Sequence, residues 1–552
     1  MKIRISSRLL LILCLLFSPT FSWGQTRKAP VPRKPVKLVV GIVIDQFRYD
    51  YLTRFGDLFG PGGFKRFLDG GAVYTNANYP YFPAITALGH SVFMTGAPPA
   101  ESGIVGNEWY DRETGKRVTS VNDPSTRIVG GSDGAGSSPH RLLVTTIGDQ
   151  LKLASAGKSR VIGISLKDRS AVLPAGKMGD AAYWYDLPTG KLITSTYYMK
   201  EQPGWAVKFN QEKGTDSYFG KTWDRLLPVS AYSLSQPDDT SYESWSFGRT
   251  FPYVINGGES KPGTQYYKQF EATPFANEML VNFAKAAIEN EKLGADEDTD
   301  LLTISFSAND LQGHSSGPYS QEMQDMTLRT DRALADLFNY LDTKIGLSNI
   351  VVVLTADHGV APVPEQLAKY GLGGRLNDTE VMRTVDRALS AKFGNDKYML
   401  FGSYGDFYFD YSVLDKKRLS HEMVEDEACN AISTMKGVAA CITRGQLENG
   451  RLPKTRIAGA VALGFNAGRN GDLIVVPKPF WLTGTDKDGT THAAPYSYDT
   501  HVPVLLFGAS INKGRFSRPV TPLDIAPTLA DLLRIEFPSN SNGQVLTEAI
   551  SR

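Results

Sequence analysis

Carboxylates and imidazoles recur in this chain at spacings that suit metal ligation. The candidate ligands are Asp45, Asp310, His314, Asp357, His358 and His492. Two of them are four residues apart and two are adjacent, and either pair alone is weak evidence because such pairs arise by chance. Together, three carboxylates and three imidazoles suffice for two tetrahedral zinc sites that each keep an open position. We therefore expect two Zn²⁺ ions, although manganese accepts similar ligands.

A candidate nucleophile, Thr86, precedes an apolar stretch after Gly89 that is typical of a helix. This spacing predicts that Thr86 lies near the helix N-terminus, where free backbone amides and the helix dipole favour an alkoxide and a phosphoryl group. A threonine hydroxyl is a poor nucleophile until a metal or a base activates it. The alternative is that Thr86 only caps the helix. The metal ligands elsewhere in the chain favour the nucleophile.

Short β-branched runs lead into several of these residues. The runs cover residues 38–44, 161–164, 301–306, 350–354 and 502–507. Continuous apolar runs are typical of parallel strands that are buried on both faces. Helical periodicity fills the gaps, notably over residues 275–287 and 323–341. We predict an α/β fold with a mostly parallel central sheet flanked by helices, and candidate residues beyond the carboxyl ends of the strands.

Two stretches, about 186–270 and about 362–490, interrupt this alternation of strands and helices. The first is rich in Tyr, Trp, Ser, Gly and Pro, and the second has mixed strand and helix patterns. We predict one catalytic domain over residues 37–552 that carries both stretches as insertions over the active edge of the sheet. Residues 25–36 contain three prolines among basic residues and predict an extended leader.

The N-terminus has the features of an export signal. Basic residues precede an apolar run at 9–17, and Ser22 and Gly24 are small residues at the −3 and −1 positions of a cleavage site. The run is shorter than the ~20 residues that a membrane-spanning helix needs. A lipoprotein anchored at Cys14 is less consistent, because the residue before that cysteine is large. We predict a signal peptide over residues 1–24 and a periplasmic or secreted protein.

Composition excludes some function classes. The chain has 59 basic and 58 acidic residues, a net charge of +1, and 41% hydrophobic residues. This is globular composition, without the basic surface that nucleic acid or an anionic membrane requires. We expect neither as a partner.

Two cysteines, Cys429 and Cys441, remain after signal removal. In an oxidising compartment they form a disulfide or remain two buried thiols, and the sequence does not decide between the two. Neither has thiolate-metal spacing, so any metal must be held by Asp, Glu and His.

The order of the candidate residues resembles that of the alkaline phosphatase superfamily across most of the mature chain. More narrowly, it is similar to the bacterial phosphate-irrepressible (PafA-type) alkaline phosphatases with a threonine nucleophile. By this resemblance one zinc is held by Asp45, Thr86, Asp357 and His358, and the other by Asp310, His314 and His492. The resemblance also implies that Asn107 contacts a phosphate oxygen and that Lys167 and Arg169 form a substrate-binding basic pair.

The basic pair also has a physical rationale. If the strand before it continues, Lys167 and Arg169 project to the same face, because alternate residues of a strand share a face. Arg169 can grip two oxygens, while Lys167 supplies a compact charge. Such cations favour a monoester, which carries nearly two negative charges, over a diester. The alternative is a solvated charge pair with Asp168.

Two segments compete with these assignments. His501 competes with His492 as the last ligand; we choose His492 because it lies in a loop, whereas His501 abuts a predicted strand. Residues 137–141 match S-x-P-x-R, the motif that sulfatases modify to formylglycine. No Thr-Gly follows this motif, whereas Thr95-Gly96 follows Thr86, so we expect residues 137–141 to start an ordinary helix.

These features predict zinc-dependent hydrolysis of small-molecule phosphate monoesters through a covalent phosphothreonine. A phosphodiesterase or nucleotide pyrophosphatase on the same scaffold is disfavoured by Lys167 and Arg169. A sulfatase is disfavoured by threonine at the nucleophile position, and a non-catalytic zinc or phosphate-binding protein would not need that threonine.

Overall fold

Seven consecutive apolar residues form the central strand β1 (Leu38–Ile44), and all seven are buried. The computed structural model describes residues 35–484 and 488–551, so the predicted signal peptide and nearly all of the leader lie outside the described residues. Strand β1 pairs in parallel with β12 (Asp300–Phe306) and β13 (Ile350–Thr355). The predicted α/β fold with a mostly parallel core is confirmed.

The central sheet has eleven strands in the order β21-β2-β20-β13-β1-β12-β7-β8-β9-β5-β6. The remaining strands are β21 (Gly514–Phe516), β2 (Ala72–Tyr74), β20 (Val504–Gly508), β7 (Val161–Ser165), β8 (Ala181–Asp186), β9 (Lys191–Ser195), β5 (Asn122–Val129) and β6 (Ala135–Ser137). Strands β13, β1, β12, β7 and β8 are parallel, whereas β20 is antiparallel to both of its neighbours, β13 and β2.

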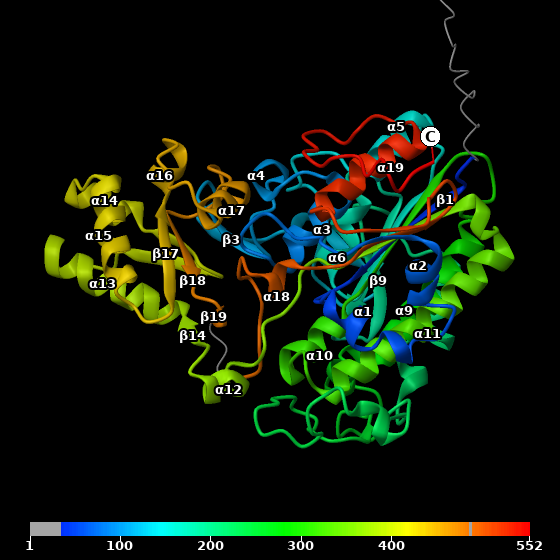
Figure 1. The fold of residues 1–552 in the computed structure, drawn as a ribbon. Coiled ribbons are helices and arrows are strands. Elements are labelled where there is room, and N and C mark those ends of the chain that lie inside the picture. Colours follow the sequence, from blue (N-terminus) through cyan, green and yellow to red (C-terminus); the bar gives the residue numbers. More distant parts are fainter. Residues whose placement is uncertain (1–34, 485–487, 552) are drawn as a thin grey trace, which may run out of the picture. The chain divides into compact units, whose positions relative to one another are not determined.

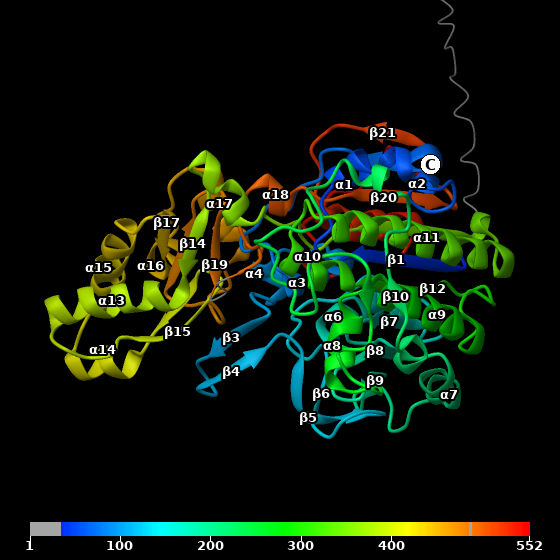
Figure 2. The same cartoon turned by 90° about the horizontal axis from the view of Figure 1, so that it is seen from below.

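Helices cover both faces of this sheet, which explains why β1 lacks polar alternation. On one face, Val40 and Ile42 pack in a core with α9 (Pro274–Asn290) and α11 (Gln321–Lys344). On the other face, Val39 and Val43 pack with α3 (Thr86–Thr95) and α19 (Ile525–Leu533). Figure 2 shows the green pair α9 and α11 beside β1 and β12, and Figure 1 shows the red α19 near α3.

The direction of β20 decides where the preceding loop lies. Thr355, the last residue of β13, is in register with Val504, the first residue of β20. The amino end of β20 therefore lies at the edge that holds the carboxyl ends of β1, β12 and β13. The loop before β20, which contains His492, reaches the same edge as the aspartates that follow those strands.

The predicted start of the first insertion, about 186–270, is too early in the sequence. Strand β9 pairs antiparallel with β8 and extends the central sheet, so the segment departs from the sheet only after residue 195. Strand β9 is short and begins with an exposed lysine, which weakens its apolar pattern. The rest contains α7 (Gly204–Glu212), the paired strands β10 (Thr222–Trp223) and β11 (Tyr253–Val254), and α8 (Thr264–Glu271).

Residues 364–484, here called the insertion subdomain, have a second sheet and a hydrophobic core of their own. The sheet order is β15-β16-β18-β17. Its strands are β15 (Met399–Ser403), β16 (Asp406–Phe409), β18 (Leu473–Pro477) and β17 (Val438–Thr443). Helices α13 (Asp378–Phe393) and α15 (His421–Ser433) pack against each other, and β15 and β17 contact them; these elements are yellow to orange in Figure 1.

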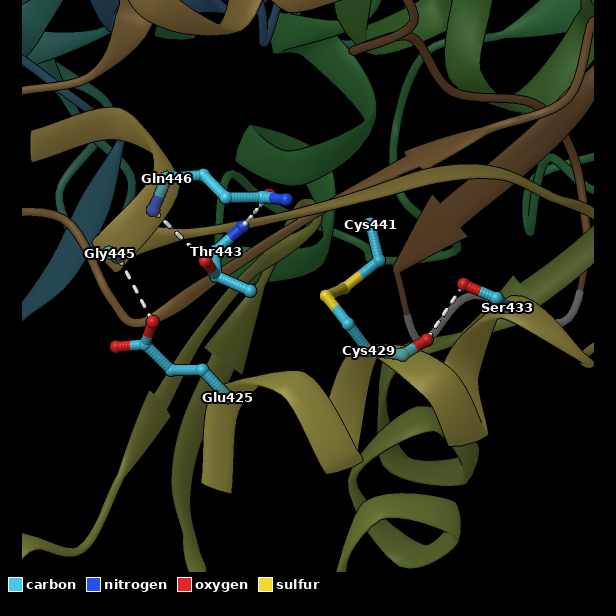
Figure 3. The surroundings of a disulfide bond; sticks show 7 residues. All are labelled: Glu425, Cys429, Ser433, Cys441, Thr443, Gly445 and Gln446. Atoms are coloured by element: carbon cyan, nitrogen blue, oxygen red, sulfur yellow. Dashed lines mark hydrogen bonds between the residues drawn. A yellow bond between two sulfur atoms is a disulfide. The ribbon is translucent and has the colours of Figure 1, made fainter. Parts of the chain in front are cut away.

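A disulfide joins Cys429 in α15 to Cys441 in β17, with their Cα atoms 5.5 Å apart (Figure 3). The pairing fastens a helix to the edge strand of the small sheet. Of the two alternatives that the sequence leaves open, the structure has the disulfide. Within the described residues, no helix combines the length and the apolar composition that crossing a membrane requires.

Candidate metal centre

Thr86 is the first residue of α3, and the extended Ile85 precedes it. Its hydroxyl therefore lies at the positive end of a ten-residue helix. Gly89 lets this helix approach the strand end that carries Asp357, because a Cβ atom on Gly89 would lie 2.3 Å from the Asp357 carbonyl oxygen. The N-cap position is Ile85, which makes no side-chain capping bond, so Thr86 is not an N-cap.

All six predicted metal ligands lie in one cluster around Thr86. His358 Nε2 is 3.4 Å from Thr86 Oγ1, 3.4 Å from Asp357 Oδ2 and 3.5 Å from Asp45 Oδ1. His314 Nε2 is 3.2 Å, and His492 Nε2 3.9 Å, from Asp310 Oδ1. Asp45 follows β1 and Asp357 follows β13, so their positions at the strand ends are as predicted.

Two overlapping groups of donor atoms are compact enough to hold a cation. One consists of Asp45, Asp357 and His358, and the other of Asp310, His358 and His492. The first corresponds to the zinc site predicted beside Thr86. His358 also belongs to the second group, where the sequence predicted His314. The rings of His358 and His492 are stacked, with centroids 3.5 Å apart.

Backbone carbonyls orient the three imidazoles. Each Nδ1 lies within hydrogen-bond distance of one carbonyl oxygen: His314 with Thr490 at 2.8 Å, His358 with Gly359 at 2.9 Å, and His492 with Ala84 at 2.8 Å. Because a carbonyl oxygen only accepts, Nδ1 carries the proton and Nε2 keeps its lone pair. This is the arrangement that metal-binding histidines use.

The donor set suits a bound cation. Among the described residues, Asp45 Oδ1 and Asp357 Oδ2 are buried without a hydrogen-bond partner. Burial, with the carboxylates of Asp310 and Asp357, raises the pKa of Asp45 well above its ordinary value. Burial, with the neighbouring His358 and His314, lowers the pKa of His492, which keeps that ring neutral. Buried carboxylates that face neutral imidazole nitrogens fit divalent metal ions.

Lys167 lies between two of these carboxylates. Its Nζ is 2.7 Å from Asp45 Oδ2 and 2.5 Å from Asp310 Oδ2. Burial lowers the pKa of Lys167, but Asp310 and Asp45 outweigh burial and raise it above its ordinary value. Burial likewise raises the pKa of Asp310, but Lys167 and His314 hold it well below its ordinary value. Lys167 is therefore a charged ammonium inside the cluster, with 11% of its side chain exposed.

The strand that was expected to carry Lys167 and Arg169 does not continue. Strand β7 ends at Ser165, and α6 (Asp168–Ala175) begins directly after Lys167, so the two residues do not share a strand face. Arg169 keeps 24% of its side chain exposed, and its Nη1 is 3.9 Å from Asp168 Oδ1. The alternative charge pair with Asp168 is thus present, but it is long, and it leaves much of the guanidinium edge available.

Asn107 lies beside the start of α3. Its Oδ1 accepts a hydrogen bond from the backbone N–H of Ala87, with a distance of 2.9 Å. This bond fixes the orientation of the amide, so its NH₂ group is the end that remains for a ligand next to Thr86.

His501 and residues 137–141, which competed with His492 and Thr86 in the sequence, lie elsewhere in the structure. His501 stacks on Tyr49, and its Nε2 is 3.0 Å from the Thr75 carbonyl oxygen, away from the ligand groups. Ser137 ends β6, and its hydroxyl donates to Asp168 Oδ2 at 2.9 Å. The expectation that residues 137–141 start a helix is wrong, because α5 (Ile147–Ala154) begins only after its cap Thr146.

Two residues that support the cluster, Gln46 and His90, were not predicted from the sequence. Gln46 donates through its side chain to Asp310 Oδ1 at 2.8 Å and through its backbone to Asp357 Oδ1 at 3.0 Å. His90 Nδ1 is 2.9 Å from the Thr86 carbonyl oxygen and 3.2 Å from Asp357 Oδ2. Only the spacing of four between Thr86 and His90, one turn of helix, signalled this role.

Known proteins are similar to this chain in sequence and in fold. A family model described as type I phosphodiesterase / nucleotide pyrophosphatase matches residues 39–501. Alkaline phosphatase PafA from Elizabethkingia meningoseptica is 38% identical over 96% of this chain and 97% of its own length. A Myroides odoratus protein named calcium-transporting ATPase is 38% identical over 99% of both chains.

A solved structure agrees with these matches. The crystal structure of wild-type alkaline phosphatase PafA superposes with a TM-score of 0.88 at 38% identity, covering 95% of this chain and all of that chain. The predicted resemblance is thereby confirmed at the level of family and fold. The chain belongs to the type I phosphodiesterase / nucleotide pyrophosphatase family, within the alkaline phosphatase superfamily.

Proposed function

We propose that this protein is an alkaline phosphatase that hydrolyses small-molecule phosphate monoesters with Thr86 as its nucleophile. A phosphoric ester hydrolase is what its family membership and its similarity to named alkaline phosphatases support. The observation that carries the finer assignment is the positive charge at the cluster: the Lys167 ammonium contacts Asp45 and Asp310, and the partly exposed Arg169 guanidinium is close enough to Lys167 for its charge to act on the Lys167 pKa. A monoester brings one more negative charge than a diester, and these two cations suit that charge.

The cluster's donor set fits two Zn²⁺ ions, one at Asp45, Asp357, His358 and Thr86, and one at Asp310, His314 and His492. Bound there, zinc would lower the pKa of the Thr86 hydroxyl and offset the charge that develops on the departing ester oxygen. The Nδ1 contacts to backbone carbonyls keep the imidazoles in the tautomer that such binding needs.

The reaction is an in-line phosphoryl transfer. Thr86 Oγ1 attacks phosphorus, so that a bond from phosphorus to the threonine oxygen forms while the bond to the ester oxygen breaks. Water then cleaves the phosphothreonine, which releases inorganic phosphate and restores the hydroxyl. The positive end of α3 would stabilise the negative charge on the oxygens of the transferring group.

Three side chains contact those oxygens in this scheme. The Asn107 amide donates through its NH₂ end, because its oxygen is held by Ala87. Lys167 has three N–H donors, of which Asp45 and Asp310 use two, so the third remains for a phosphoryl oxygen. Arg169 offers two donors in a fork. Together they neutralise the dianion and orient it for attack by Thr86.

Matched substrates test the proposal directly. The purified, zinc-loaded protein should hydrolyse p-nitrophenyl phosphate with a kcat/KM far above that for methyl p-nitrophenyl phosphate, which has the same leaving group. The second candidate function, a phosphodiesterase or nucleotide pyrophosphatase, is favoured by the description of the matching family. A higher kcat/KM on the diester would establish that function and exclude the first.

The proposed setting is extracytoplasmic. The basic and apolar pattern at the start of the chain and the Cys429–Cys441 disulfide are both typical of exported proteins. Cell fractionation with an antibody against the protein would test this. An uncleaved N-terminus and a cytoplasmic fraction would contradict it.

A further inference from the structure

The insertion subdomain extends a hairpin tip toward the metal centre. Strands β15 and β16 are joined by the two-residue turn Tyr404-Gly405, whose φ angles are 49° and 85°. Gly405 packs close to the segment that leads to Thr86, because a Cβ atom on it would lie 3.4 Å from the Phe82 ring. Asp378, the first residue of α13, accepts the Tyr404 backbone N–H at 3.2 Å. The tip is therefore held in place from both sides.

A tyrosine is an unusual residue for this turn. Two consecutive positive φ values are typical of a type I′ turn, which favours Asn, Asp or Gly, and a bulky residue there is strained. Strain of this kind is retained where the side chain has a use. At Tyr404 the side chain is directed to the cluster: its ring lies at 15° to the His492 ring, with centroids 6.3 Å apart.

Exposure increases outward along a series of parallel rings. His358 is fully buried, His492 stacks on it and is 4% exposed, and Tyr404 is partly exposed. His314, whose ring centroid is 5.3 Å from that of His492, has a side chain that is 32% exposed. The cluster therefore opens to solvent on the side of His314 and Tyr404, while His492 between them is buried.

This is the side on which the ester's leaving group would lie. In an in-line transfer the attacking and leaving oxygens are on opposite sides of phosphorus. In the proposed function Thr86 shares one metal site with Asp45, Asp357 and His358, so the leaving oxygen faces the other site, formed by Asp310, His314 and His492. A substituent on that oxygen projects outward past His492, where the Tyr404 ring lies.

We propose that Tyr404 forms the aromatic wall of the leaving-group subsite, so that this enzyme prefers phosphate esters with a flat, aromatic leaving group. The inference rests on the proposed function, because it uses Thr86 as the attacking group. Stacking between aromatic rings contributes enough for a preference of about two- to tenfold over a small alkyl group. Asp378 is a positioning residue for this wall, through the Tyr404 backbone.

The test uses Tyr404→Asn and Tyr404→Phe in the zinc-loaded full-length protein. Asparagine suits the positive φ of the turn and removes the ring, so that loss of the ring is separated from misfolding. Calorimetry measures the binding of phenylphosphonate and methylphosphonate, and kinetics compares phenyl phosphate with methyl phosphate. We expect Tyr404→Asn to weaken phenylphosphonate binding about two- to tenfold, leave methylphosphonate unchanged and lower the kcat/KM ratio of phenyl to methyl ester equally. Tyr404→Phe should behave as the wild type.

The control variant is Phe401→Leu, which changes an aromatic residue in the same hairpin whose ring contacts Tyr408 instead of the cluster. It should alter neither ratio. Equal losses for phenyl and methyl ligands together with lower zinc content would overturn the proposal and reduce Tyr404 to a packing partner of His492. No change in either ligand would also overturn it. If the wild type hydrolyses neither ester, the proposed function fails, while phosphonate binding still reports on the wall.

Discussion

Buried carboxylates have different surroundings in the metal centre and in the insertion subdomain. In the centre, Asp45 Oδ1 and Asp357 Oδ2 are buried without a hydrogen-bond partner among the described residues. In the insertion subdomain, the buried Asp472 accepts hydrogen bonds from the Tyr411 hydroxyl at 2.5 Å, the Arg112 guanidinium at 2.6 Å and the Phe409 backbone at 2.7 Å.

The two regions also differ in how far apart in sequence their partners are. The centre joins residues 45, 86, 310, 357 and 492, whereas the disulfide spans a separation of 12 residues. Near that disulfide, Thr443 caps α16 (Arg444–Glu448), and Glu425 accepts from the Gly445 backbone (Figure 3). The difference indicates that the centre suits an external cation, whereas the buried carboxylate of Asp472 in the insertion subdomain is satisfied by hydrogen bonds from protein groups.

Metal removal should separate the two regions most strongly. A chelator should abolish activity and lower the unfolding temperature, since each ion bound at about 1,000 times its Kd contributes roughly 4 kcal/mol to the free energy of unfolding. Elemental analysis after dialysis should find two zinc ions per chain, and added zinc should restore activity. Full activity in chelator with less than one metal ion per chain would contradict the scheme.

Replacing Thr86 tests its role as the nucleophile and should leave the fold unchanged. Thr86→Ala should reduce kcat on the order of 10⁴- to 10⁶-fold, the scale seen when a nucleophile is removed from a hydrolase. Zinc content and the unfolding temperature should change little, because the carboxylates and imidazoles remain. Trapping labelled phosphate at low pH and mapping the peptide should identify Thr86. Label on Ser91, Thr95 or Ser137 would refute the assignment.

Replacing Arg169 tests whether its charge recognises the monoester or its side chain only shapes the site. Arg169→Ala should lower kcat/KM for the monoester about ten- to a hundredfold, since a charge-assisted hydrogen bond contributes about 1.5–3 kcal/mol. The diester should lose less, so the ratio of monoester to diester kcat/KM should fall. Arg160→Ala is a matched control, because Arg160 lies before the amino end of β7 and is 53% exposed.

Lys167→Ala gives a different pattern from Arg169→Ala. Lys167 contacts Asp45 and Asp310, so its loss should weaken metal binding and reduce the hydrolysis of both substrates.

Equal losses of monoester and diester hydrolysis in Arg169→Ala would mean that Arg169 only shapes the site. The preference for monoesters would then lack its physical basis.

The smallest effect on activity is expected in the insertion subdomain. Replacing Cys429 and Cys441 with serine should lower the free energy of unfolding by about 2–4 kcal/mol, because the disulfide restricts the unfolded chain. Activity at 25 °C and zinc content should remain within about twofold, since none of the proposed metal ligands lies in this subdomain. Loss of zinc in the variant would show that the two regions depend on each other more than we infer.

Much of the central sheet could be predicted from local pattern. The runs that became β1, β7, β12, β13 and β20 are apolar without alternation, because helices cover both faces. Strand β9 was missed because its pattern is short and partly polar. The continuation of β7 past Ser165 was a wrong expectation, since residue types alone did not mark where the backbone turns into α6.

Residues of the centre divide in the same way. Asp45 and Asp357 could be predicted because they directly follow strands, and a strand end specifies a sheet edge. Gln46 and Tyr404 could not, because each acts through a partner that is distant in sequence, and the only signal for His90 was its spacing of four from Thr86. Tyr404 in particular reaches His492 only through the turn of a hairpin in another sheet.

The sequence by itself determined which residue types are available and which segments are strands or helices, because those follow from short-range periodicity. Only the tertiary structure decided that β20 runs antiparallel and so brings His492 to the edge that carries Asp310. It also decided that Lys167 lies between two carboxylates rather than in solvent. The physical reason is that buried charge must be compensated in space, and the groups that compensate it are chosen by packing of the sheet, not by distance along the chain.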